Sequence, residues 1–256
     1  MWTEMNEMIQ TILNHRSIRS FEDKPLTEEQ ISVIVQSAQA AATSSFVQAY
    51  SIIGIKDPSK KEKLAELAGN QAYVSKNGHF FVFCLDLHRL ELAGRMEGLS
   101  GEDAKETLTS TEMFMVGVID ATLAAQNAVM AAESMGLGVC YIGGIRNHLE
   151  LVSELLKTPS RVVPLFGLCV GYPADHSDKK PRLPQMNIYH EDEYNQDTDQ
   201  FIDQLEQYNA EISTYYASRT NGKRNDRWTE GMARFLKNPK RLYIKDYLEK
   251  IELPLK

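Results

Sequence analysis

The chain has 256 residues, enough for one large domain or two small ones, and 43% of them are hydrophobic, which excludes a disordered composition. Its 28 Lys and Arg residues against 35 Asp and Glu residues give a formal net charge of −7, which disfavours a dedicated nucleic-acid-binding protein. A negative chain can still hold an anionic ligand at a local basic site.

The first third of the chain predicts helices around one strand. Residues 5–14 have apolar side chains at helical spacing, and the predicted helix ends in the basic turn HRSIRSF. Thr27 and Gln30 have the spacing of a capping box, so a second helix should begin there and bury Ile34 and Ala38. A strand is predicted over 50–55, followed by a surface helix over 58–68 that Gly69 closes.

The middle of the chain predicts a sheet with a long helix. Residues 79–85 are continuously apolar, as in a central strand, and two more strands are predicted over 139–142 and 162–170, with a helix over 149–156 between them. The segment 111–135 is apolar or small nearly all round, so we expect a long helix that is buried on most sides and ends at Gly136. These elements indicate an α+β layered core.

After Gly171 the composition changes. Residues 191–206 hold seven acidic residues and no Lys or Arg, which indicates a solvated segment, whereas 219–245 hold nine Lys or Arg residues and two acids. No independent linker separates these stretches, so we interpret residues 1–256 as a single domain. Its core would run from about 5 to 172 and carry a C-terminal extension over about 173–256.

Two basic elements could bind an anion. The run His15-Arg16-Ser17-Ile18-Arg19 places guanidinium, imidazole and hydroxyl donors close together; alternatively, its basic residues simply complement the helix dipole. In the second element, Pro181 stiffens the chain between Lys180 and Arg182, although a solvated loop is the alternative. Together the two elements suggest a phosphate clamp.

Three further segments could contact a flat ligand. Gly143 and Gly144 directly follow a strand and could bring backbone N–H groups close to it, or could serve a tight turn. The segments Thr43-Ser44-Ser45 and Gln71-Ala72-Tyr73 offer hydroxyl, amide and phenol groups for a heterocycle edge, or are ordinary loop chemistry.

Several other kinds of site are disfavoured. Gly136-Leu137-Gly138 follows a helix and precedes a strand, the reverse of a dinucleotide fingerprint, and the chain has no P-loop, Gly-x-Ser-x-Gly or paired-histidine metal motif. Cys84, Cys140 and Cys169 lie in apolar runs without a Cys-x-x-Cys pair, so we expect reduced, inert thiols. The first ten residues lack a signal-peptide layout, and the longest uncharged stretch, 31–55, is too polar for a membrane span. We therefore expect a cytoplasmic protein without a membrane segment.

The ordered motifs HRSIR, ATSSF, QAY, AAQNAVMAAESMGLGVCYIGGIRN, PLFGLCVGYPAD and KPRLP resemble the FMN-dependent, oxygen-insensitive nitroreductase family. Within that family the chain looks like the NfsA/Frp/NfrA branch of NADPH-dependent flavin reductases, from about residue 5 to the C-terminus. The resemblance implies a central, mainly antiparallel sheet flanked by helices, in a homodimer with two FMN sites at the interface. The helix over 111–135 would form much of the interface, and the C-terminal arm would wrap the partner subunit.

The resemblance also implies roles for individual residues. The FMN phosphate would be held by His15, Ser17, Lys180 and Arg182, with Arg16 adding a contact. Arg19 would lie at the flavin N1/O2 edge and stabilise the anionic reduced ring. The remaining cofactor-binding positions would be Gln71 at the pyrimidine edge, Tyr73 near it, Tyr141, Ile142, Gly143 and Gly144 along the ring, and Thr43, Ser44 and Ser45 from the other subunit. Thr43 stands where the family pattern has Ser, and keeps the hydroxyl.

The implied activity is ping-pong hydride transfer from NADPH to FMN, then reduction of nitroaromatics, quinones, azo compounds or free flavin. Arg219 and Arg224 would receive the NADPH 2′-phosphate, with NADH as a second donor. No protein side chain would act as a catalytic acid or nucleophile, and no metal is expected. Two other classes stay open: an FMN carrier or sensor with little turnover, and a phosphate-binding regulatory protein without redox activity.

Overall fold

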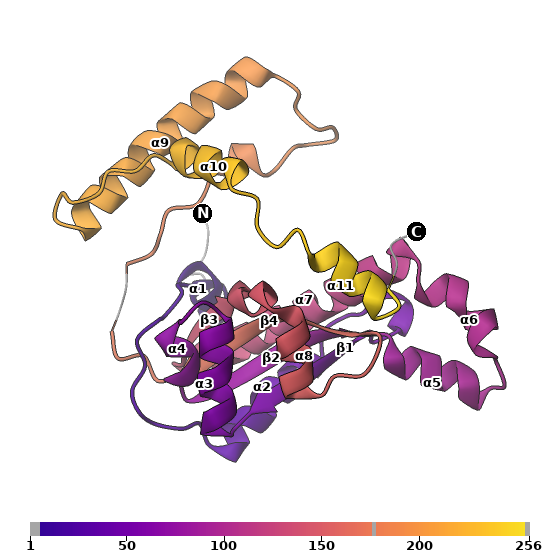
Figure 1. The fold of residues 1–256 in the computed structure, drawn as a ribbon. Coiled ribbons are helices and arrows are strands. Elements are labelled where there is room, and N and C mark those ends of the chain that lie inside the picture. The colour runs from indigo at the N-terminus through magenta and orange to yellow at the C-terminus, as the bar shows by residue number, and fades with distance from the viewer. Residues whose placement is uncertain (1–5, 176–177, 254–256) are drawn as a thin grey trace. The chain divides into compact units, whose positions relative to one another are not determined.

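The computed structural model describes residues 6–175 and 178–253, so Met5 of the first predicted helix and His176 lie outside the described residues. The chain divides into two compact units (Figure 1). The first comprises residues up to 177 together with those from 241 onward, and the second comprises residues 178–240. The segment from 241 therefore does not continue the second unit, although the sequence suggested one extension from about 173 to the C-terminus.

The first unit is built on a four-stranded antiparallel sheet. Its strands follow the order β1 (Tyr50–Ile55), β2 (His79–Asp86), β4 (Val162–Gly171) and β3 (Gly138–Ile142). Every residue of β2 is buried, which confirms the predicted central strand. The α+β fold with a mainly antiparallel sheet is thereby confirmed.

Helices cover both faces of this sheet (Figure 1). Because successive strand residues point to opposite faces, Phe80 and Val82 pack toward α3 (Pro58–Leu67), α4 (Ala72–Ser75) and α8 (Leu149–Leu156), whereas Phe81 and Phe83 pack toward α2 (Glu28–Gln39) and α7 (Thr111–Ser134). The other elements of this unit are α1 (Glu7–Leu13), η1 (Ser44–Phe46), α5 (His88–Met96), α6 (Gly101–Leu108), η2 (Gly143–Asn147) and α11 (Ile244–Lys250).

The start of α2 confirms the predicted capping box. The Gln30 backbone N–H donates to Thr27 Oγ1 at 3.1 Å, and the Thr27 N–H donates to Gln30 Oε1 at 3.0 Å. Each side chain thus satisfies a backbone donor that a helix terminus leaves without an internal partner. Ile34 and Ala38 are buried, as the helical spacing predicts.

The long helix α7 is buried on one side. Alanines at its inner face, including Ala124 and Ala128, are fully buried against the sheet and α2, and at Gly117 an added Cβ would come within 2.8 Å of Leu85 Cδ1. The expectation of burial on most sides is wrong for a single chain, because the sheet and α2 cover only one face. The outer face leaves three large apolar side chains exposed: Met115, Ile119 and Leu123.

By length and composition α7 could cross a membrane, which the search for an uncharged stretch overlooked. Half of its most apolar 18-residue window is buried within the protein. It is the one such helix among the described residues.

The C-terminal segment packs onto the first unit. Tyr247, Leu248 and Leu253 join a core cluster that includes Leu85 and Leu149. These aromatic and aliphatic side chains therefore complete the core of the first unit rather than that of the second.

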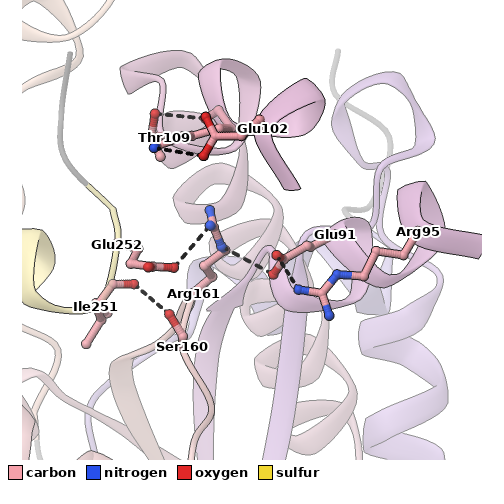
Figure 2. Close-up of polar contacts among 9 residues, drawn as sticks. Glu91, Arg95, Glu102, Thr109, Ser160, Arg161, Ile251 and Glu252 are labelled. Atoms are coloured by element: carbon pink, nitrogen blue, oxygen red, sulfur yellow. Dashed lines mark hydrogen bonds and ion pairs between the residues drawn. The ribbon is translucent and has the colours of Figure 1, made fainter. Parts of the chain in front are cut away.

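Polar contacts fix the end of the same segment (Figure 2). Arg161, only 7% exposed, pairs with Glu91 of α5 at 3.3 Å and with Glu252 at 3.2 Å, and Ser160 Oγ donates to the Ile251 carbonyl at 3.0 Å. The two carboxylates offset part of the cost of burying the positive charge of the guanidinium. The network joins α5, the start of β4 and the residues after α11.

The second unit contains η3 (Gln185–Asn187), α9 (Thr198–Arg219) and α10 (Trp228–Lys237). Helices α9 and α10 meet through Asn209 and Thr229, which exchange side-chain and backbone hydrogen bonds of 3.0–3.2 Å. Arg227 adds an ion pair to Glu206 at 2.9 Å. The acidic stretch predicted as solvated is indeed exposed, but from residue 198 onward it is helical.

Candidate functional site

The segment that follows α1 runs along β3. The Ile18 N–H donates to the Val139 carbonyl at 2.8 Å, and Ser17 forms a parallel bridge with the same residue. Gly138 permits this approach, since a Cβ there would lie 2.8 Å from Ile18 Cβ. The basic run therefore occupies a fixed place at the edge of the sheet.

His15 and Arg16 face different partners at the start of this segment. His15 Nδ1 lies 2.8 Å from Glu133 Oε1 near the end of α7, and the other oxygen of Glu133 is buried without a hydrogen-bond partner in the described chain. Arg16 Nε donates to the Asn14 carbonyl at 3.1 Å, the contact that the helix-dipole alternative expects. Arg16 and Glu133 also line a cavity of about 470 Å³.

Arg19 belongs to a second cluster, with residues from α4 and its preceding turn. Burial raises the pKa of Tyr73, the nearby Cys140 adds to this, and a hydrogen bond from Arg19 opposes it. The Tyr73 hydroxyl donates to Gln71 Oε1, and Gln71 Nε2 donates to the Ala68 carbonyl at 2.6 Å. The structure thus joins Gln71 and Tyr73 by a hydrogen bond and places Arg19 close enough to lower the pKa of the Tyr73 phenol, which brings three predicted cofactor-binding residues together.

The glycines after β3 complete this cluster. A Cβ on Gly144 would collide with the Ala68 carbonyl oxygen and come within 2.7 Å of Gln71 Nε2, so only glycine fits there. A Cβ on Gly143 would lie 3.1 Å from Arg146 Nη2. The backbone of η2 therefore lies directly against Gln71, which confirms the tight turn at these glycines, and their contact with a ligand stays a prediction.

Tyr141 and Ile142 lie on opposite sides of β3. Ile142 is buried, whereas Tyr141 is 39% exposed and makes an edge-to-face contact with Phe166, with 5.5 Å between ring centroids. Burial of the phenol raises the pKa of Tyr141, and Glu133 adds to the effect. At neutral pH the Tyr141 ring is therefore an uncharged surface beside the glycines.

Thr43, Ser44 and Ser45 lie elsewhere on the first unit. The Ser44 and Ala49 backbone N–H groups each donate to a carboxylate oxygen of Asp120 at 2.9 Å, and Asp120 is fully buried on α7. Asp120 was not predicted, although a lone acid in an apolar helix could have indicated such a role. It holds a turn in which Ser45, Phe46 and Gln48 all have positive φ.

This turn is far from His15 within one chain. Asp120 and Glu133 are thirteen residues apart on α7, which corresponds to about 20 Å at the rise of a helix. A single chain therefore does not bring the hydroxyls of Thr43–Ser45 to the basic segment.

Lys180 and Arg182 belong to the second unit. Lys180 Nζ donates to Tyr216 Oη at 2.9 Å, and Arg182 Nη1 donates to the Lys180 carbonyl at 3.2 Å. The hydrogen bond from Lys180 lowers the pKa of the Tyr216 phenol, although burial opposes it. Arg224 stacks on the same ring at 4.4 Å, so Lys180 shares a tyrosine with a predicted NADPH-binding arginine.

Arg219 and Arg224 follow one another around the end of α9. Arg219 Nη1 donates to Tyr215 Oη at 3.0 Å, and Arg224 Nε donates to Asp226 Oδ2 at 2.7 Å. Tyr215 and Tyr216 contact each other edge to face, with centroids 5.4 Å apart. The arrangement collects cations and aromatic rings on one small surface, and neither tyrosine was predicted.

The thiols are inert, as expected. Cys84, Cys140 and Cys169 are free and buried, and burial raises the pKa of each, that of Cys84 to about 12. A thiol that stays protonated at neutral pH is a poor nucleophile. Among the described residues, no group of His, Cys, Asp and Glu could hold a metal ion.

Known proteins match this chain along nearly its whole length. The FMN reductase (NADPH) of Bacillus subtilis is 58% identical over 245 residues, which cover 96% of this chain and 97% of that protein. The solved structure of NfrA1 from B. megaterium has a TM-score of 0.94 and 61% identity, covering 96% and 99% of the two chains. A Vibrio harveyi NADPH:FMN oxidoreductase complexed with NAD+ has a TM-score of 0.85 and 37% identity, covering 96% and 98%.

Two family models also match. The model of the nitroreductase family matches residues 12–172, and that of the nitroreductase family C-terminal domain matches residues 180–256. The first spans the sheet and the cluster of Arg19, Gln71, Tyr73 and Gly144, and the relatives above extend over both parts. By sequence, fold and the residues gathered at the end of β3, this chain belongs to the nitroreductase family.

Proposed function

We propose that the protein is an FMN-dependent oxidoreductase that takes hydride from NADPH and reduces small electron acceptors. The observation that supports this proposal is the cluster of Arg19, Gln71, Tyr73 and Gly144, four residues for which the family resemblance implies contacts with FMN. The B. subtilis relative named FMN reductase (NADPH) supports the same cofactor and donor.

The residues of the first unit fit FMN chemically. A guanidinium and a carboxamide, from Arg19 and Gln71, suit the pyrimidine edge of a flavin, whose N1 and O2 atoms accept hydrogen bonds. His15, Arg16 and Ser17 offer the donors that a phosphate requires, and the sheet holds their segment in place. Lys180 and Arg182 stay predicted phosphate ligands.

We further propose a homodimer in which the Thr43–Ser45 turn reaches the flavin of the partner subunit. The distance of about 20 Å along α7 between the attachment points of this turn and of His15 supports the proposal. The exposed face of Met115, Ile119 and Leu123 supplies an apolar surface for the interface. The cytoplasmic location expected from the sequence is part of the same proposal.

The basic surface of the second unit suits the donor. Arg219 and Arg224 carry delocalised charges, and Tyr215 and Tyr216 offer aromatic faces beside them. A 2′-phosphate accepts charge-assisted hydrogen bonds from arginine, whereas the 2′-hydroxyl of NADH cannot pair with the charge. We therefore propose that these arginines select NADPH, while NADH reacts more weakly.

Bound FMN supplies the hydride chemistry, so no side chain needs to act as an acid, base or nucleophile. Arg19 places positive charge at the pyrimidine edge and favours negative charge there. Gly144 lies against Gln71, so the backbone of η2 would lie beside a flavin bound there, and the uncharged ring of Tyr141 would be close to it. One pocket that takes donor and acceptor in turn implies ping-pong kinetics, with nitroaromatics, quinones, azo compounds or free flavin as acceptors.

An anaerobic visible spectrum of the purified protein tests the proposal. We expect flavin bands that bleach on addition of NADPH, more slowly with NADH, and that return when a nitroaromatic or quinone is added. Bands that do not bleach would identify a flavin carrier or sensor rather than the proposed enzyme. A protein without flavin bands after incubation with FMN would contradict the cofactor assignment itself.

A further inference from the structure

The C-terminal segment of the first unit contacts the junction between η2 and α8. Tyr243 Oη donates to the Arg146 carbonyl at 2.7 Å and accepts from the Leu149 N–H at 2.9 Å. Two residues earlier, Arg241 Nε donates to Asn147 Oδ1 at 2.9 Å. One phenol thus connects the end of η2 to the first residue of α8, from a segment almost a hundred residues further along the chain.

The junction lacks a capping side chain of its own. His148 precedes α8 with φ −143 and ψ 64, and its side chain makes no capping hydrogen bond. The first N–H groups of a helix have no partner inside the helix, so an outside acceptor is required. Tyr243 supplies that acceptor to Leu149 and gives its own proton to the Arg146 carbonyl, which makes the hydroxyl a bridge rather than an ordinary cap.

The Tyr243 hydroxyl holds the segment that begins with the two glycines of the proposed flavin site. Gly143 and Gly144 begin η2, and Arg146, whose carbonyl accepts from Tyr243, is two residues after Gly144. The Arg146 side chain is fixed as well: Nη1 donates to the Leu165 carbonyl at 2.5 Å, and Nη2 lies 3.1 Å from the place of a Cβ on Gly143. A shift of the Arg146 backbone would therefore disturb Gly143 beside the Arg146 side chain and Gly144 against Gln71.

We propose that Tyr243 is a positioning residue that holds η2 in the geometry that binds FMN. The proposal rests on the proposed FMN site and adds a role for a residue that lies outside it. Neither Gly143 nor Gly144 has a side chain that could anchor the turn. The position of the turn therefore depends on the contacts made by the residues that follow it. Hydrogen bonds to the residues that support a binding site determine how accurately its ligand contacts are held.

Tyr247 provides a matched control on the same segment. It is 6% exposed, and its hydroxyl lies 2.6 Å from Ser153 Oγ within α8, with no bond to η2. Tyr243→Phe and Tyr247→Phe each delete one phenol oxygen that contacts α8, the first from a half-buried tyrosine and the second from a buried one. Tyr243→Phe removes two hydrogen bonds and Tyr247→Phe removes one, so both variants should lose thermal stability, whereas only Tyr243→Phe should loosen the glycine turn.

The experiment measures the FMN dissociation constant of each holoenzyme on dilution, from the fluorescence of released FMN, together with backbone amide exchange over 143–149. We expect Tyr243→Phe to weaken FMN binding roughly three- to tenfold, the range that corresponds to one net hydrogen bond, and to speed exchange over η2. We expect Tyr247→Phe to stay within about twofold of the wild type in both measurements.

Equal FMN affinity and equal exchange over 143–149 in the two variants would overturn the inference, because Tyr243 would then be a stabilising contact like Tyr247. In that case the wild type still binds FMN and the proposed function stands. A wild-type protein that does not bind FMN would instead refute the proposed function, and this inference with it.

Discussion

Asp120→Asn tests how the Thr43–Ser45 turn is held. The carboxylate of Asp120 is fully buried, and each of its oxygens accepts one backbone N–H at 2.9 Å, from Ser44 and Ala49. Asparagine has the same shape but only one acceptor oxygen. Its NH2 group would face one of the two N–H groups, so one hydrogen bond is lost and two donors are placed against each other.

The expected cost follows from these two bonds. A hydrogen bond to a charged group contributes about 1.5–3 kcal/mol, and a buried donor left without a partner costs about 1–3 kcal/mol. Removing the buried charge offsets part of this, so we expect a net loss of about 2–4 kcal/mol. For a chain of this size the melting temperature should fall by roughly 4–16 °C.

Thermal melts at fixed protein and FMN concentration check this value. Asn127→Ala is the matched control, because Asn127 lies on the same helix and its side chain makes one neutral hydrogen bond, to the Ser37 carbonyl at 3.2 Å. We expect a loss of about 1 kcal/mol for that variant. If Asp120→Asn melts within 1 °C of the wild type, the carboxylate does not hold the turn as argued.

Four further variants test other parts of the structure. Gly144→Ala should lower both stability and FMN content, because the added Cβ collides with the backbone of Ala68. Gly231→Ala, in an open position of α10, should stabilise the protein by about 0.5–1 kcal/mol. Equal effects of the two variants in urea unfolding would contradict the steric argument. Burial and neighbouring lysines lower the pKa of His79 to about 4 in the folded protein. As pH falls below 6.5, His79 therefore takes up a proton in the unfolded chain before it does so in the folded protein. The free energy of unfolding should decrease as pH falls from 6.5 toward 4. His79→Gln should remove up to about 3 kcal/mol of that loss, and an unchanged pH profile of urea unfolding would show that His79 is not its source. Arg219→Ala should raise the NADPH KM at least about tenfold and leave the NADH KM unchanged, whereas equal changes would mean that Arg219 does not recognise the 2′-phosphate.

The local sequence pattern was sufficient to predict the bounds of several strands and helices. The strand over 50–55 and the helix over 149–156 have the predicted bounds, and the capping box begins α2 where expected. These features depend on neighbouring residues, since capping and the spacing of apolar side chains act within a few positions. The helices α5, α6 and α10 were not predicted, and α9 was not recognised behind its acidic composition.

The candidate site was predicted in its residue types and only partly in its assembly. Arg19, Gln71 and Tyr73 do lie together, but their order in the sequence contains no information on the hydrogen bond between Tyr73 and Gln71 or on the place of Arg19 beside them. Glu133 beside His15 was missed because an acid near the end of a helix is an ordinary surface feature until a partner is known. Tyr216, the partner of Lys180, was missed because the two residues lie 36 positions apart and no local pattern links them.

The sequence by itself determined the family, the strands and the residue types that can bind a phosphate and a flavin, because these follow from motifs and short-range periodicity. Only the tertiary structure decided that Asp120 holds the serine turn about 20 Å along α7 from His15, and that Tyr243 bridges η2 and α8. Both depend on contacts between residues more than seventy positions apart. Such contacts form when the chain packs its apolar faces together, and no local pattern specifies which polar groups then meet.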